Sequence, residues 1–132
     1  MDTSDVFFTI SIQGEHLDPI DVSEATGLFP TKSYTKGNPK GNSNAIATHG
    51  LWEWRSPIKS ESIRNHLMHL KDKLTGDINL SSVKFIEHAF IDILILSKKE
   101  HGKEYKIDLD VDSINILKKI GLPVELTYGV FD

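Results

Sequence analysis

The sequence predicts an α+β domain, with a five-stranded, mostly antiparallel or mixed sheet and helices packed on it. Three observations predict this class. Several short segments alternate apolar and polar residues with the period of a strand, whereas others carry the wider spacing of an amphipathic helix. These segments are interspersed without the regular repetition of βαβ units. The chain has 132 residues, which is close to the commonest length of one domain, so residues 1–132 are expected to fold as a single unit.

The first thirty residues predict a strand followed by a short helix. Residues 5–13 alternate cleanly between an apolar and a more polar face. The apolar face is formed by Val6, Phe8, Ile10 and Ile12. A helix is expected near 19–26, because Asp18 can accept hydrogen bonds from the first free amides and Pro19 suits the first helical position.

The middle of the chain predicts a loop, a strand and the clearest helix. Residues 31–45 are rich in Gly, Pro and Asn and show no periodicity, which predicts a loop. Residues 45–55 return to a strand. An amphipathic helix capped by Ser60 is expected near 60–74, followed by a short helical piece at 81–87.

The last third of the chain predicts a hairpin of two strands, followed by a helix and a final strand. Residues 89–97 are apolar on both faces, which predicts a central strand covered on both sides. Residues 98–103 predict a hairpin loop that leads into a return strand over 105–111. A helix near 112–120 and a final strand over 124–130 complete the expected fold.

A faint internal echo leaves a second architecture open. Leu17-Asp18 leads through a helix to Gly27-Leu28, and Leu109-Asp110 leads through a helix to Gly121-Leu122. Two such units would form a duplicated ferredoxin-like plan.

Composition and the N-terminus predict a cytoplasmic protein. The chain holds no cysteine, which excludes a disulfide framework and a thiolate zinc site. The acidic Asp2 and Asp5 stand where a signal peptide carries basic residues. No apolar run approaches the roughly 20 residues of a membrane span. We therefore expect no membrane contact, no metal and no cofactor.

The net charge of −4 is unevenly distributed. Residues 31–59 hold five basic residues and one acidic residue, which gives this stretch +4 and leaves −8 for the remainder. One acidic group consists of Glu15, Asp18, Asp21 and Glu24, and another of Glu104, Asp108, Asp110 and Asp112. Such asymmetry can steer a charged partner, although acidic surfaces are also common on proteins that only need to stay dissolved.

The predicted loop and the strand after it supply the candidate binding residues. They are Lys32, Lys36, Trp52, Trp54 and Arg55. In one interpretation the indole rings stack on bases or sugars while the basic side chains bind phosphate. In the other, both indoles bury apolar area in the core. The acidic chain as a whole disfavours a general nucleic-acid binder.

Three further features were weighed as catalytic or metal sites. His66 and His69 share a helix face but lack a third ligand on it, so we expect histidines at the solvent boundary. Asp92 lies within an apolar strand, where a carboxylate is either perturbed or satisfied by a partner. The 31–45 loop lacks the spacing of a phosphate-binding loop. No catalytic residue follows from these patterns, which favours a protein that is not an enzyme.

Several short motifs carry a family resemblance by their order and spacing. They are the first strand, Leu17-Asp18-Pro19, Gly27-Leu28-Phe29-Pro30-Thr31, Lys36-Gly37, Gly50-Leu51-Trp52 with Ser56, and Ile120-Gly121-Leu122. On these motifs the chain resembles the bacterial domain of unknown function 4279 family over nearly its whole length. The resemblance implies an α+β fold and a free-standing bacterial protein, and it supplies no catalytic residues. Some members resemble toxin-neutralising immunity proteins.

These features favour an uncharacterised, non-catalytic protein-interaction module, with an immunity protein as the sharpest version. The expected partner is a basic protein, because an acidic surface speeds its capture. The expected contact surface is either the helix start with Asp18, Asp21 and Glu24 or the return strand with Asp108 and Asp110. One alternative is a small-molecule-binding protein or enzyme with a pocket between the 31–49 loop and the Trp52 strand. Another is a single-stranded nucleic-acid binder. The oligomeric state stays open.

Overall fold

The computed structural model describes residues 5–74, 76, 78–98 and 107–131. The strands are β1 (Asp5–Gly14), β2 (Lys32–Tyr34), β3 (Gly50–Arg55), β4 (His88–Lys98) and β5 (Val124–Phe131). The helices are α1 (Pro19–Thr26), α2 (Ile63–Lys73) and α3 (Val111–Ile120), with a 3-10 turn, η1, at Leu80–Ser82. The predicted α+β class is confirmed.

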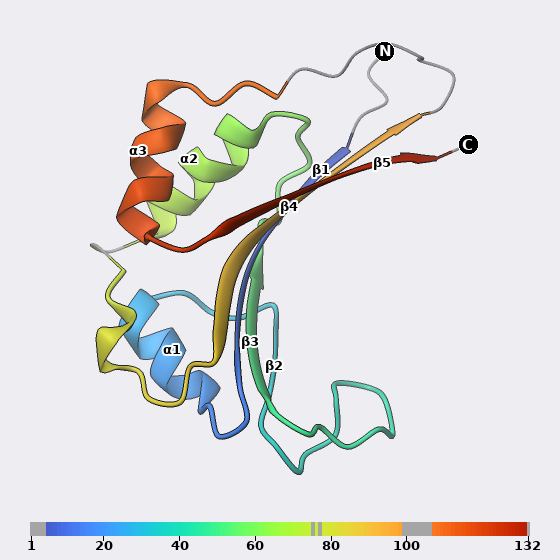
Figure 1. Cartoon of the computed structure of the whole chain (residues 1–132), viewed down its shortest axis with the longest axis vertical. Helices are drawn as coiled ribbons and strands as arrows, with labels where there is room; N and C mark the ends of the chain where they lie inside the picture. Colours follow the sequence, from blue (N-terminus) through green and yellow to red (C-terminus); the bar gives the residue numbers. More distant parts are fainter. Residues whose placement is uncertain (1–4, 75, 77, 99–106, 132) are drawn as a thin grey trace.

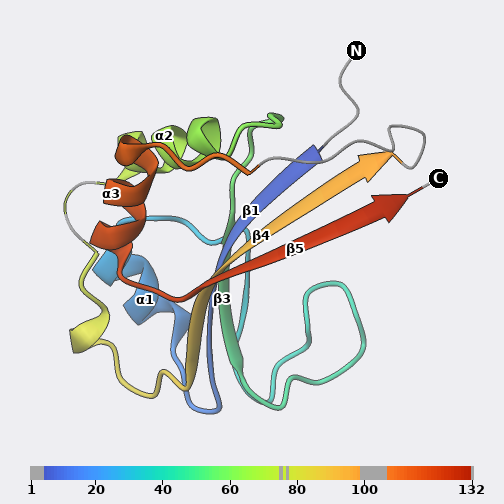
Figure 2. The ribbon, with the colours of Figure 1, turned by 45° about the horizontal axis from the view of Figure 1, so that its top comes forward.

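The five strands form one mixed sheet in the order β2-β3-β1-β4-β5. All neighbouring strands run antiparallel except β4 and β5, which are parallel. Figures 1 and 2 show the three helices on one side of the sheet, whereas the connection from β2 to β3 extends away from them. The sheet therefore has a helix-covered face and a face that carries no helix.

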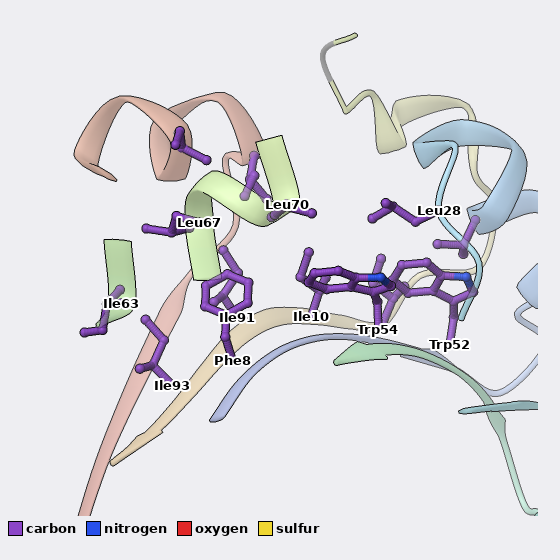
Figure 3. Close-up of a cluster of buried hydrophobic side chains, with 14 of the residues drawn as sticks. Phe8, Ile10, Leu28, Trp52, Trp54, Ile63, Leu67, Leu70, Ile91 and Ile93 are labelled. Carbon is purple, nitrogen blue, oxygen red and sulfur yellow. The ribbon is translucent and has the colours of Figure 1, made fainter. Parts of the chain in front are cut away.

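The hydrophobic core lies between the sheet and the helices. The predicted alternation in β1 is confirmed, because Val6, Phe8, Ile10 and Ile12 are all buried. The buried residues of β4 are Ile91, Ile93 and Ile95, and those of α2 include Leu67 and Leu70. Figure 3 shows side chains from β1, β4 and α2 meeting between the strands and the helices, among them Phe8, Ile91 and Leu67. Burial of each such side chain contributes about 1.5–3 kcal/mol.

The helix ends follow the capping chemistry of the sequence. The carboxylate of Asp18 accepts a hydrogen bond from the Ile20 amide at 3.0 Å, and Gly27 ends α1 in the left-handed region at φ 75°. The cap of α2 is Ser62, two residues after the expected cap Ser60, and the helix begins at Ile63. Residues 81–87 form only the short turn η1 at their start.

The predicted strand over 105–111 was wrong, and the predicted loop over 31–45 needs a correction. Residues 107–110 have no regular structure, and Val111 already belongs to α3. The reason is that the Asp110 carboxylate accepts a hydrogen bond from the Ser113 amide at 2.8 Å and starts the helix there. The rest of the predicted hairpin, residues 99–106, lies outside the described residues. The 31–45 loop instead contains β2, which exists because it pairs with β3.

Two predictions about sheet architecture also need correction. Strand β4 is an interior strand, as expected, but it is not covered on both sides: Leu94 and Leu96 on its second face are only half-buried. The duplicated ferredoxin-like plan is not confirmed. Helix α3 connects β4 and β5, which are direct parallel neighbours, whereas α1 connects β1 and β2, which lie on either side of β3. The two strand-helix units are therefore not equivalent within the sheet.

Candidate functional site

The two predicted tryptophans lie in the core on the helix side of β3. Trp52 is fully buried, and its Nε1 donates a hydrogen bond to the Ser23 Oγ at 3.1 Å. Trp54 packs its ring edge-on against Phe8 and stacks on His69, with ring centroids 6.3 Å apart in the latter pair. Figure 3 shows both indole rings side by side above the strands. The interpretation in which both indoles bury apolar area is confirmed.

The three basic candidates do not join the tryptophans. Lys32 and Arg55 belong to the opposite face of the sheet, because side chains alternate along a strand and Trp52 and Trp54 point to the helices. Lys32 lies over the Tyr34 ring, with its Nζ 5.9 Å from the centroid. Lys36 binds the Glu15 carboxylate at 2.6 Å. A binding role for the basic side chains stays a prediction, but it would have to work without the indoles.

His66 is not the boundary residue that was expected, because it is only 1% exposed. Its Nε2 lies 2.9 Å from the Ser60 carbonyl, and its Nδ1 lies 2.7 Å from the Ser56 Oγ. A carbonyl can only accept, so Nε2 carries the proton and Nδ1 accepts from Ser56. Burial lowers the pKa of His66 below its ordinary value, opposed in part by the Ser60 carbonyl. This neutral histidine ties the segment after β3 to α2.

The described residues hold no cluster of three or more metal-ligating side chains. His66 is buried, and His69 stacks on Trp54. Asp92 lies on the uncovered face of β4, half-buried and opposite Thr9 on β1 and Glu125 on β5. Asp92 is therefore not a fully buried carboxylate.

A polar cavity lies at the end of β1, where the 31–49 loop approaches the sheet. Its volume is about 480 Å³. The lining residues are Gln13, Gly14, Glu15, Thr48, His49, Glu87 and His88. The Glu87 carboxylate accepts a hydrogen bond from the Glu15 amide, and the Glu15 carboxylate is engaged by Lys36, which lowers its pKa. Both carboxylates of the cavity therefore already have partners within the protein.

The surface around α1 combines exposed apolar and acidic side chains. Phe29 is 89% exposed and Ile20 is 65% exposed. Asp21 and Glu24 are also exposed, and neither forms an ion pair within the part of the chain that the structure describes. We call these four residues the α1 surface. The sequence carried a signal for Phe29: the glycine cap at Gly27 sends the chain on in extended form, so that the residue after the buried Leu28 points outward.

Two carboxylates of the second acidic surface predicted from the sequence share one arginine. Arg64 of α2 binds the carboxylate of Asp110 at 2.6 Å and that of Asp112 at 3.1 Å. The Ser113 amide and then Arg64 hold the pKa of Asp110 below its ordinary value. These carboxylates start α3 and connect it to α2. On α1, in contrast, neither Asp21 nor Glu24 has a cation partner among the described residues.

The sheet and helices define an α+β domain, and the predicted α1 and loop sites are features of its surface. Residues 4–130 match the family model described as "Domain of unknown function (DUF4279)". The chain belongs to this family. Searches of curated proteins and of solved structures gave no match. Within the described residues, no helix is long and apolar enough to cross a membrane.

Proposed function

We propose that this domain is a non-catalytic protein-interaction module that binds a basic protein through the α1 surface. Its sharpest version is an immunity protein that neutralises a basic toxin. The observation that carries the proposal is Phe29, a large aromatic side chain left 89% exposed next to a helix with free carboxylates. An aromatic anchor with a charged surround is typical of interface residues that carry most of the binding energy.

The charges around α1 support the choice of a basic partner. Asp18 caps the helix, whereas Asp21 and Glu24 project from it without an internal cation in the described structure. The chain outside residues 31–59, which includes α1, carries a net charge of −8. The electrostatic potential around these residues is therefore expected to be negative. Complementary charge raises the rate of encounter and weakens as salt screens it. A nuclease toxin, which must be basic to hold phosphate, fits this field.

The test is a pull-down from the native cell with the products of adjacent genes present, at low and at physiological salt. The wild type should retain a basic protein that is lost as salt rises. The amount of this protein retained should fall by about tenfold or more in the double variant Asp21→Lys with Glu24→Lys. It should fall by a similar factor in the separate variant Phe29→Ser.

The matched control reverses two exposed carboxylates elsewhere, on and before α2, in the double variant Glu61→Lys with Asp72→Lys. This control changes the net charge equally and should keep most of the binding. Equal loss in both double variants would show that net charge alone attracts the partner. Retention of the partner by all variants would place the contact surface elsewhere and end the proposal for α1.

A further inference from the structure

Strand β5 is an edge strand without the features that usually block an edge. It has eight residues and pairs only with β4 among the described strands. Its register with β4 runs without a break from Val124 to Phe131, so it contains no bulge. It contains no proline and no lysine, and Glu125 is its one charged residue. Natural proteins protect long edges with such devices, because an open edge can pair with another chain.

The helix-side face of β5 is apolar and exposed. Its residues are Val124, Leu126, Tyr128 and Val130, and each is between 39% and 56% exposed. They share a face with the buried Ile91, Ile93 and Ile95 of β4, to which they are paired in register. The two rows differ in their place in the sheet, because β4 lies between β1 and β5 whereas β5 is at the edge. Figure 2 shows β5 along that edge, with its C-terminal half extending beyond α3. Within the described part of the chain, the hydrophobic face of the sheet thus continues to an exposed edge.

The direction of the backbone groups follows from one hydrogen bond. The Ile91 amide donates to the Pro123 carbonyl at 2.8 Å. Backbone groups alternate in direction along a strand, so those of residues 125, 127 and 129 also face β4. The amides and carbonyls of Val124, Leu126 and Val130 therefore point outward. The same residues that expose apolar side chains present backbone donors and acceptors at the edge.

We propose that β5 pairs antiparallel with β5 of a second copy of this chain, about a two-fold axis at Thr127. This register sets Val124 against Val130 of the copy and Leu126 against its Tyr128. It also sets Glu125 against Gly129, so the two glutamates do not face each other. Thr127 meets Thr127 of the copy on the uncovered face, and such threonine pairs are favourable across strands.

The self-complementary sequence is the reason to choose a second copy over another extended chain. About a two-fold axis, each residue meets the residue at the mirrored position of the same strand. In the segment from Val124 to Val130, every apolar residue of the helix-side face meets another apolar residue in this way. Each copy carries −4, so their long-range interaction is repulsive. The dimer should therefore become tighter when salt rises from about 10 mM to about 0.15 M, which shortens the range of the repulsion. The proposed basic partner of α1 responds in the opposite direction, so the two proposals can fail separately.

The first experiment measures association of the purified full chain by sedimentation velocity over a range of concentrations. The wild type should show a concentration-dependent dimer. Leu126→Lys should weaken it by about tenfold or more, because the edge would then bury an unpaired ammonium. The control Ile46→Lys makes the same change at another exposed apolar residue, in the loop between β2 and β3, and should dimerise like the wild type.

The second experiment fixes the register by cross-linking, and it uses the absence of native cysteine. At the proposed axis Thr127 and its copy form a pair without backbone hydrogen bonds, with Cα atoms about 4.5 Å apart. That distance suits a disulfide, so Thr127→Cys should give a covalent dimer on oxidation. Glu125→Cys lies about 14 Å from its copy along the strands and should not.

Circular dichroism of each variant checks that the fold is retained. If Leu126→Lys fails to fold, the comparison between the two cysteine variants still decides the question. A wild type that stays monomeric at the highest concentration, or a Thr127→Cys variant that cross-links no faster than Glu125→Cys, would overturn the proposal.

Discussion

The two edges of the sheet differ in almost every property that governs pairing. At one edge, β2 is three residues long and begins with Lys32. At the other edge, β5 is eight residues long, and its one charge is Glu125 on the uncovered face. A three-residue strand offers few backbone groups to another chain, whereas β5 offers a continuous row. The chain blocks one edge by length and charge and leaves the other open.

The difference extends from the edge into the core. Next to β2, the helix-side face of β3 is filled by Trp52 and Trp54, which are buried under the helices. Next to β4, the equivalent face of β5 stays exposed along its whole length. We call the end of the sheet at β2 and β3 the finished end, because the helices bury Trp52 and Trp54 there. We call the end at β5 the unfinished end, because its apolar side chains stay exposed. An unfinished end that is apolar and regular is where a second chain can complete the fold.

The largest expected effect tests the finished end. Trp52→Ala removes a fully buried indole and its hydrogen bond to Ser23, and it should lower the free energy of unfolding by about 3–5 kcal/mol. The measurement is urea unfolding at a protein concentration below dimerisation, since association would add to the stability. Leu126→Ala at the unfinished end should change the free energy of unfolding of the monomer by about 0.5 kcal/mol or less. Similar losses at the two sites would show that β5 is packed like β3, against the exposures seen here.

Much of the fold could be predicted from local sequence. The β1 alternation, the Asp18-Pro19 helix start and the glycine caps at Gly27 and Gly121 report interactions within a few residues, so they hold wherever the segment packs. The failures have two different causes. Strand β2 depends on its non-local pairing with β3. The alternation of residues 107–111 instead competes with a local signal, the helix cap formed by Asp110 with the Ser113 amide, and the cap prevails.

The candidate sites were harder to predict for the same reason. The sequence places Trp54 and Arg55 side by side, but strand alternation sends them to opposite faces of the sheet. His66 was expected at the boundary because its position on the helical stripe says nothing of the partners that enclose it. Those partners, Ser56 and Ser60, come from the preceding segment. The exposure of β5 depends on which other elements pack over it, which no local pattern records.

The second prediction uses His66, which anchors the segment that leaves the finished end of the sheet. In the unfolded chain a histidine titrates near its ordinary pKa of about 6.5, whereas burial lowers the pKa of folded His66. Below about pH 6.5 the unfolded state therefore binds more protons than the folded state. The contribution of neutral His66 to stability is fully present above that pH and is lost as pH falls toward the folded pKa.

The measurement is the free energy of unfolding from about pH 8 to about pH 5. The wild type should lose stability toward the acid end. His66→Gln should start lower but show a flatter profile, because the titrating group is gone. His16→Gln, which changes an exposed histidine, is the matched control and should keep the slope of the wild type. An unchanged slope in His66→Gln would assign the acid sensitivity to another group.

The smallest expected effect tests whether charge or length closes the β2 edge. Lys32→Val removes the only basic residue of β2 and leaves three residues that could pair. The side chain is exposed, so the free energy of unfolding should change by about 0.5 kcal/mol or less. We expect no new association, because so short a strand cannot form a ladder that offsets the cost of joining two chains. Sedimentation velocity in the Leu126→Lys background isolates this edge from β5. If Lys32→Val restores a dimer there, then the single lysine, and not the length of the strand, is what keeps the β2 edge closed.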